Sequence, residues 1–177
     1  LEMLKRDCIL NKNFTNLYNK FCPGPLTFIL KLKKDSKISK FVTNNKKTLA
    51  VRFPSHPKAK SLLKILNYPL AAPSANISSR VSPVTKNHVK EEFGKEIKYI
   101  IEGGLSKIGL ESTIINLIGK PEILRIGSID INKLSKALKR KLFYRKKTYM
   151  KVPGQNMLHY SPGIPLRMNC KAVSYTH

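Results

Sequence analysis

The sequence predicts an α+β protein in which several strands form an open, mixed sheet with helices packed on it. Two observations support this fold class. Helical and strand-like segments follow one another without strict βαβ alternation, and neither a G-x-G-x-x-G nor a Walker A motif is present. The chain has 177 residues and is 41% hydrophobic, which suffices for one domain with a sizeable core and an extension. We therefore expect a mixed sheet rather than a Rossmann fold.

The first half of the chain contains the clearest periodicities. Apolar residues at helical spacing predict a helix over 13–21, which ends before the Pro-Gly-Pro turn at 23–25. Period-two alternation predicts strands over 26–32 and 48–54, because successive side chains of a strand point to opposite faces. A proline in the first turn predicts a further helix over 57–67.

The second half continues the mixture of strands and helices. A short apolar run predicts a strand over 68–72, and a helix over 83–94 is closed by Gly94. A last amphipathic helix is expected to open near Ser128 or Asp130. Three further strands are expected at about 98–101, 112–117 and 121–126.

The composition changes after residue 138. Between Lys136 and Lys151 there are eight basic residues and no acidic one, interleaved with aromatic residues. The prolines and glycines that follow exclude regular structure. We therefore assign residues 1–138 to the domain and residues 139–177 to a basic linker that contains proline and glycine.

The chain is strongly basic, with 34 Lys and Arg against 10 Asp and Glu and a formal net charge of +24. Such a charge favours polyanionic partners, although AT-rich coding DNA also produces a composition rich in Lys, Asn and Ile. No apolar run of membrane-spanning length and no leader peptide is found, which predicts a cytoplasmic protein without a membrane partner. The wide spacing of Cys8, Cys22 and Cys170 predicts free thiols.

Polar residues at the ends of predicted strands are candidates for a ligand site. Ser74 and Asn76 follow the 68–72 run, within PLAAPSANISSRVSP, where they either face a ligand or hold a turn. Arg52 shares a strand face with Thr48. An isolated arginine on a strand either binds an anion or lies on an exposed edge, and both interpretations stay open.

A similar pattern recurs further along the chain. Arg125 is a second isolated arginine in a strand, and two such residues suit a ligand with two anionic centres. Ser112 begins a strand after a glycine-containing loop, which is equally an ordinary strand entry. The S-x-x-K match at 61–64 lies in an apolar helix pattern, and His56 is interpreted as a loop residue. The four histidines are far apart and predict no metal site.

Six segments, in this order and at these intervals, resemble the YrdC/Sua5 family of threonylcarbamoyl-AMP synthases over about residues 20–130. They are KFCPGPLTFIL, LAVRFPSHP, PLAAPSANISSRVSP, IIEGG, GLESTIINL and ILRIGSI. The tail VPGQNMLHYSP is similar to the SPGM-x-x-HYxP linker of the longer Sua5 branch, with Val152 in place of the usual serine.

The resemblance implies a twisted mixed sheet flanked by helices around a positive concave cavity. It implies a transferase that condenses L-threonine, bicarbonate and ATP to threonylcarbamoyl-AMP and pyrophosphate, with Mg²⁺ accompanying ATP. The product supplies the t6A modification of tRNA, so contact with tRNA or other RNA and a downstream t6A transferase machinery are implied partners. Positioning and charge neutralisation carry most of such a reaction, and no catalytic side chain is assigned.

The resemblance also implies contacts for both substrates, carried over position by position. ATP contacts are implied at Thr48, Ser74, Asn76, Ser82 and Arg125. L-Threonine contacts are implied at Arg52, Ala72 and Ser112.

Two departures from the family pattern stand out. The N-terminal PTxTxYGL and KxRP elements are absent, leaving Lys5 and Arg6 near the start, and no Rossmann-like domain follows the linker. We therefore expect a central fragment of a synthase. Whether this fragment is active by itself stays open. Two alternatives stay open: a carbamoyltransferase module of the HypF type, and a non-catalytic RNA-binding protein that uses the basic stretch 136–151.

Overall fold

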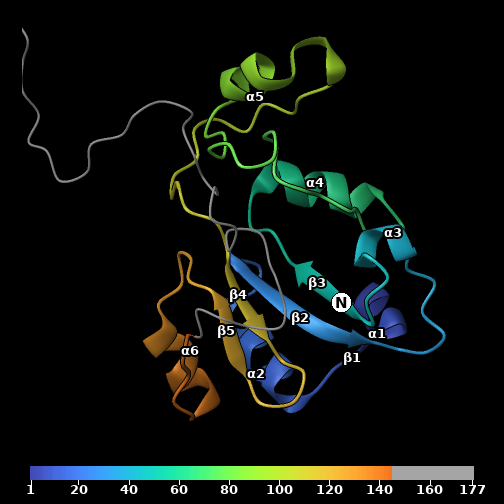
Figure 1. Cartoon of the computed structure of the whole chain (residues 1–177), viewed down its shortest axis with the longest axis vertical. Coiled ribbons are helices and arrows are strands. Elements are labelled where there is room, and N and C mark those ends of the chain that lie inside the picture. Colours follow the sequence, from blue (N-terminus) through green and yellow to red (C-terminus); the bar gives the residue numbers. More distant parts are fainter. Residues whose placement is uncertain (145–177) are drawn as a thin grey trace, which may run out of the picture.

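The structure, a computed structural model, describes residues 1–144 and shows an open mixed sheet with helices around it (Figure 1). The α+β fold class predicted from the sequence is confirmed. Most of the predicted linker, including the VPGQNMLHYSP motif and Cys170, lies outside the described residues. Among the helices of residues 1–144, none has the length and apolar character needed to cross a membrane.

The sheet is built around strand β2 (Leu26–Leu32). β2 pairs antiparallel with β3 (Thr48–Arg52) along one edge and parallel with β4 (Thr113–Asn116) along the other. The short β1 (Cys8–Ile9) pairs antiparallel with the C-terminal end of β2, and β5 (Glu122–Arg125) pairs antiparallel with β4. Parallel and antiparallel ladders therefore occur in one sheet, as the unalternating order of elements predicts.

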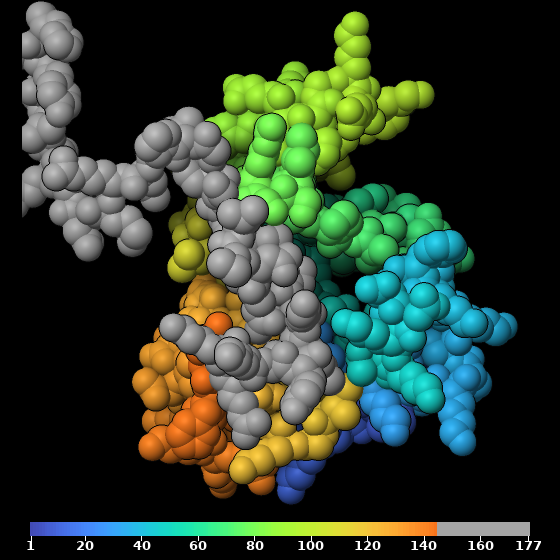
Figure 2. Space-filling view, in the orientation of Figure 1, coloured from blue at the N-terminus to red at the C-terminus, as the bar shows by residue number. Residues whose placement is uncertain are grey.

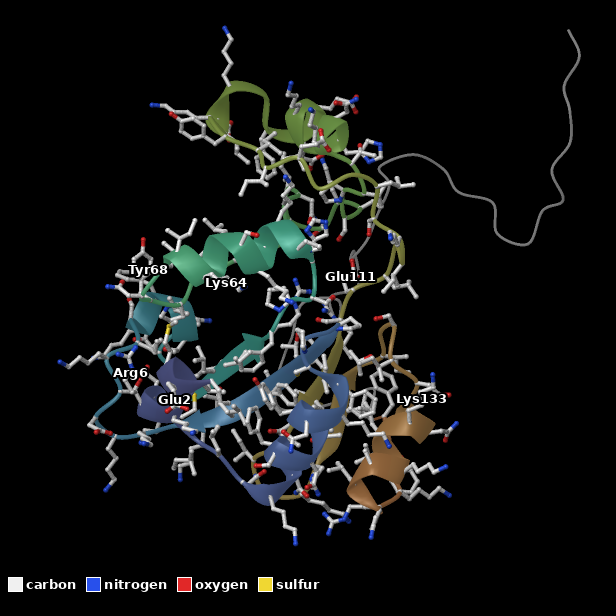
Figure 3. The ribbon with its side chains drawn as sticks, turned by 180° about the vertical axis from the view of Figure 1, so that it is seen from behind. Glu2, Arg6, Lys64, Tyr68, Glu111 and Lys133 are labelled. Atoms are coloured by element: carbon white, nitrogen blue, oxygen red, sulfur yellow. The ribbon has the colours of Figure 1, made fainter. Side chains whose placement is uncertain are left out.

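Helices α2 and α6 lie together on one face of the sheet, the face that is turned toward the viewer in Figure 3. Each begins at a side-chain cap: Asn11 accepts a hydrogen bond from the amide of Phe14 at 2.9 Å, and Asp130 accepts one from Asn132 at 2.7 Å. The four predicted helices are confirmed with shifts of a few residues at their ends. The helices are α1 (Glu2–Asp7), α2 (Lys12–Phe21), α3 (Lys40–Thr43), α4 (Pro57–Ile65), α5 (Lys86–Phe93), the 3₁₀ turn η1 (Gly94–Glu96) and α6 (Ile131–Leu138).

The core lies between the sheet and the α2–α6 pair. Phe28 and Leu30 of β2 are buried in one cluster with Phe14 and Leu17 of α2. The rings of Phe14 and Phe28 meet edge to face with their centroids 5.0 Å apart. Burying a side chain of this kind stabilises the fold by roughly 1.5–3 kcal/mol. The opposite face of the sheet carries a smaller apolar cluster of Ile29, Ile114 and Leu124.

Two predicted strands, at 68–72 and 98–101, are wrong. Both segments are irregular backbone, and Tyr99 within the second is 89% exposed. Pro69 and Pro73 lack the amide hydrogen that a ladder needs, and neither segment pairs with a strand of the sheet. Helices α4 and α5, which flank the first of these segments, contain no buried residue. This part of the molecule therefore adds little to the core.

Candidate functional site

A row of residues runs across the sheet on the face opposite α2 and α6. Thr27 of β2 pairs with Arg52 of β3 on one side and with Ile114 of β4 on the other, and Ile114 pairs with Arg125 of β5. Paired residues of neighbouring strands point to the same face of a sheet, so both arginines face the same side as Thr27. Arg52 and Arg125 are three inter-strand spacings apart, roughly 14 Å between their Cα atoms.

A hydrogen-bonded group forms around Ser112, just before β4. The hydroxyl oxygens of Ser112 and Thr27 are 2.7 Å apart. Arg125 donates from Nη2 to the Ser112 hydroxyl at 3.1 Å and from Nε to the Ser112 carbonyl oxygen at 3.0 Å. Ser112 is only 4% exposed, so these bonds fix its orientation. We refer to Thr27, Arg52, Ser112 and Arg125 as the sheet-end cluster.

Thr27 is a member that the sequence analysis did not single out. The alternation in the segment 26–32 could have indicated it, because Thr27 lies on the face opposite the apolar Leu26 and Phe28. A polar side chain on that face, level with the predicted Arg52, would have pointed to a shared site.

Arg52 is the exposed member of the sheet-end cluster. It takes part in none of the three ion pairs found among residues 1–144, so its guanidinium stays available to an anionic ligand. Thr48 lies on the same face but at the other end of β3, four residues and roughly 13 Å away. A ligand that touches both side chains therefore has to lie along β3.

Ser82, another predicted residue, is connected to the sheet-end cluster through Glu111. Its hydroxyl donates to Glu111 Oε1 at 2.7 Å, and Glu111 immediately precedes Ser112. Gly127 packs so tightly here that a Cβ at this position would overlap the carbonyl oxygen of Glu111. The amide of Ser128 donates to the same oxygen at 3.3 Å. Figure 3 shows Glu111 beyond the ends of the strands. The sequence analysis did not name this residue, although its position next to the predicted Ser112 was a signal.

Asn76 combines the two interpretations of the polar segment after residue 73. Its Nδ2 donates to the carbonyl oxygens of Ile77 at 2.9 Å and Arg80 at 3.0 Å, so the side chain holds a turn. Its Oδ1 is buried and has no hydrogen-bond partner within residues 1–144. An unsatisfied acceptor of this kind costs roughly 1–3 kcal/mol unless a ligand supplies a donor. Ala72 and Ser74 are exposed on irregular backbone, and the structure does not place them in the sheet-end cluster.

His56 lies on irregular backbone, as predicted, and has a defined structural role there. It is the N-cap of α4, where Nδ1 accepts a hydrogen bond from the amide of Lys58 at 3.2 Å. Its Nε2 lies 3.1 Å from the carbonyl oxygen of Gly103, within the IIEGG segment. The histidine therefore connects the start of α4 to the glycine loop that leads to Ser112.

A cavity of about 330 Å³ lies beside the Pro-Gly-Pro turn at 23–25, and none of the predicted site residues lines it. Cys22, which lines it, is a free cysteine as predicted. Burial raises the pKa of the Cys22 thiol to about 11, so little of it is thiolate near neutral pH. In the part of the chain that the structure describes, no group of three or more His, Cys, Asp or Glu side chains could hold a metal ion.

The family of the chain follows from its sequence. Residues 1–127 match the model of the Sua5/YciO/YrdC family, whose description reads "Telomere recombination". The chain belongs to this family, and the resemblance seen in its motifs is confirmed.

Two curated relatives cover most of the chain. It is 39% identical over 167 residues to the threonylcarbamoyl-AMP synthase of Schizosaccharomyces pombe, an alignment that covers 87% of this chain and 41% of that protein. It is 37% identical over 168 residues to the threonylcarbamoyl-AMP synthase of Pyrococcus abyssi, covering 92% of this chain and 48% of that protein. The chain thus spans less than half the length of these two relatives.

Solved structures share the fold. The crystal structure of P. abyssi Sua5 complexed with L-threonine superposes with a TM-score of 0.81 and 34% identity, covering 90% of this chain and 48% of that chain. The crystal structure of Escherichia coli YciO superposes with a TM-score of 0.65 and 27% identity, covering 75% of this chain and 65% of that chain. These matches agree with the mixed sheet described above.

Proposed function

We propose that this chain provides substrate-binding residues of an L-threonylcarbamoyladenylate synthase. This enzyme, a nucleotidyltransferase, condenses L-threonine, bicarbonate and ATP to threonylcarbamoyl-AMP and pyrophosphate. Membership of the family supports the proposal, as do the names of the two curated relatives and the L-threonine bound to the P. abyssi structure.

The sheet-end cluster is the observation that carries the proposal. Arg52 presents an exposed guanidinium, whose planar fork matches a carboxylate such as that of L-threonine. Arg125 lies at the other end of the row and is bonded to Ser112, and it would meet the nucleotide part of the ligand. The separation of roughly 14 Å suits one ligand with a carboxylate at one end and a phosphoryl group further along.

Other predicted residues take supporting roles in this proposal. Asn76 supplies a buried acceptor, Oδ1, that a donor on the nucleotide would satisfy. Ser82 is tied to Glu111 beside Ser112 and would present its hydroxyl near the same ligand. Thr48 and Ser74 are proposed as further ATP contacts, and Ala72 as a contact of L-threonine.

The chemistry requires positioning more than a dedicated catalytic side chain. The amine nitrogen of threonine bonds to the carbon of bicarbonate, water is lost, and the product is a carbamate. A carbamate oxygen then bonds to the α-phosphorus of ATP while the bond from that phosphorus to the bridging oxygen breaks and pyrophosphate leaves. Guanidinium groups that hold both anionic ends in place favour this second step by orientation and charge neutralisation.

Mg²⁺ belongs to the proposal as part of the MgATP substrate, because phosphate oxygens are ligands that this ion prefers. The product carries a reactive mixed anhydride and is proposed to pass to a t6A transferase machinery that acts on tRNA.

The test incubates the chain with ¹³C-bicarbonate, L-threonine, ATP and Mg²⁺ and measures labelled threonylcarbamoyl-AMP by mass spectrometry. P. abyssi Sua5 is the positive control, and omission of L-threonine is the negative control. We expect labelled product from the chain and an equal amount of pyrophosphate, with neither formed when threonine is omitted.

A binding measurement keeps the site testable apart from turnover. Titration calorimetry with L-threonine should give a binding signal in the wild-type chain that Arg52→Ala removes. Absence of both labelled product and threonine binding would contradict the proposal. Binding that depends on Arg52 supports the assigned site even where turnover is low.

A further inference from the structure

The connection between β2 and β3, residues 33–47, presents an exposed aromatic ring among many positive charges. Phe41 is 99% exposed, and the neighbouring Val42 is 48% exposed. Figure 2 shows this connection, in light blue to cyan, projecting at one edge of the molecule. It contains a single acidic residue, Asp35, and six exposed lysines: Lys33, Lys34, Lys37, Lys40, Lys46 and Lys47.

The exposure of Phe41 follows from the geometry of α3. Thr43 is 8% exposed, and its hydroxyl donates to the carbonyl oxygen of Lys40 at 3.2 Å, so it faces the protein. Two residues along a helix are about 200° apart, which turns Phe41 to the opposite side, toward solvent. Ser39 caps the helix by accepting a hydrogen bond from the amide of Phe41 at 3.3 Å. The ring is therefore presented by a regular, capped turn.

The rest of the connection is held by Asp7 at the end of α1. The carbonyl oxygen of Asp7 accepts a hydrogen bond from the amide of Lys33 at 2.8 Å. Its carboxylate accepts from the hydroxyl of Ser36 at 2.8 Å and from the amide of Lys37 at 3.3 Å. None of the six lysines takes part in the ion pairs found among residues 1–144. The lysine side chains of the connection are thus exposed to solvent, while its backbone is held in place by hydrogen bonds to Asp7.

We infer that residues 33–47 form a binding surface for single-stranded nucleic acid, in which a base stacks on Phe41 and phosphates meet the lysines. Aromatic rings beside cations bind single strands in this way, since every base has a face that can stack. An interfacial membrane helix needs an apolar face several turns long, whereas α3 has four residues. This surface is distinct from the sheet-end cluster and from the basic stretch 136–151, and it does not depend on synthase activity.

The test measures fluorescence anisotropy of a labelled 12-nucleotide RNA strand, with the full chain and its variants. Phe41→Ala should weaken binding about tenfold, as expected for the loss of one stacked base. Phe41→Leu keeps an apolar side chain without a ring and should weaken binding similarly, whereas Phe41→Tyr should keep it within about twofold of wild type. An RNA duplex of the same length has no free base to stack and should be insensitive to all three changes.

The lysines are tested by neutralisation with a matched control. The double variant Lys40→Gln and Lys46→Gln should lower the slope of log affinity against log salt by about 1.4, from two lost phosphate contacts on a single strand. The control neutralises the exposed Lys120, in the turn between β4 and β5, and Lys133 on α6, two elements that Figure 1 shows apart from α3. It changes the net charge equally and should leave the slope nearer to that of the wild type.

Three results would overturn the inference. The first is wild-type affinity for RNA in the Phe41→Leu variant. An apolar contact, and not base stacking, would then account for the contribution of Phe41 to binding. The second is an equal loss of slope in the Lys120 and Lys133 control, which would show unspecific attraction by the net charge. The third is binding to vesicles of phosphatidylserine and phosphatidylcholine that depends on Phe41 while binding to RNA does not.

Discussion

Arg52 and Arg125 occupy the same row of the sheet but have different surroundings. Arg125 is partly buried and donates two hydrogen bonds to Ser112, one of them to a buried hydroxyl. Arg52 is exposed and has no ion-pair partner among the described residues. Arg125 therefore has a structural role in addition to its proposed contact with ATP, whereas Arg52 is available for a ligand.

This difference predicts distinct effects of the two alanine variants. Both Arg52→Ala and Arg125→Ala should abolish formation of threonylcarbamoyl-AMP while leaving the domain folded. Arg125→Ala should also lower the free energy of unfolding by about 1–3 kcal/mol, because the buried Ser112 loses the two hydrogen bonds that Arg125 donates to it. Arg52→Ala should stay within about 0.5 kcal/mol of wild type. Urea unfolding followed by circular dichroism measures both values, and an unfolded Arg52→Ala variant would contradict the assignment.

At the scale of elements, Asn11 joins helix α2 to the sheet. Its Oδ1 caps the helix, and its Nδ2 donates to the carbonyl oxygen of Leu117, just after β4, at 2.9 Å. The two partners are separated by 106 positions in the sequence, so one side chain fixes the start of α2 against the C-terminal end of β4. The contact joins α2 to the end of β4 that lies opposite Ser112.

The two functions of Asn11 can be separated by substitution. Asn11→Ser keeps a capping oxygen but is too short to reach Leu117, and it should cost about 1 kcal/mol of unfolding free energy. Asn11→Ala loses both contacts and should cost about 2 kcal/mol. Thermal and urea unfolding of the two variants give the comparison. Equal stability of Asn11→Ser and wild type would show that the contact to Leu117 contributes nothing.

At the scale of the molecule, burial is concentrated in the sheet and in helices α2 and α6. Leu17, Leu26, Phe28, Ile115 and Leu134 are each 0% exposed. Helices α4 and α5 contain no buried residue, and residues 101–110 are exposed throughout. Local stability follows buried apolar contact, so the segment 57–110 should open far more often than the sheet.

Hydrogen–deuterium exchange tests this division. Peptides from α4 and α5 should exchange at least about a hundredfold faster than peptides from β2 and β4, whose amides open only with the whole domain. The comparison is internal to one sample, so β2 serves as the control. Equal protection in α4 and β2 would mean that residues 57–110 are stabilised by contacts not seen in this structure.

The sequence predicted the core elements well because their periodicities reflect burial. The strand over 26–32 and the helix over 13–21 follow from alternation and from helical spacing, and both are confirmed. The runs at 68–72 and 98–101 are also apolar but lie outside the sheet. Their composition alone therefore led to two wrong strand predictions. The contact between Ser112 and Thr27 could not be predicted from spacing, since it joins residues 85 positions apart.

The position of Thr27 within β2 has a consequence for how this protein can change. Thr27 faces the sheet-end cluster, while Phe28, the next residue, fills the core between the sheet and α2. A slip of β2 by one residue would bring the threonine into the core and the phenylalanine into the polar row. A one-residue insertion at the start of β2 would therefore damage site and core together, whereas insertions in surface loops leave both unchanged.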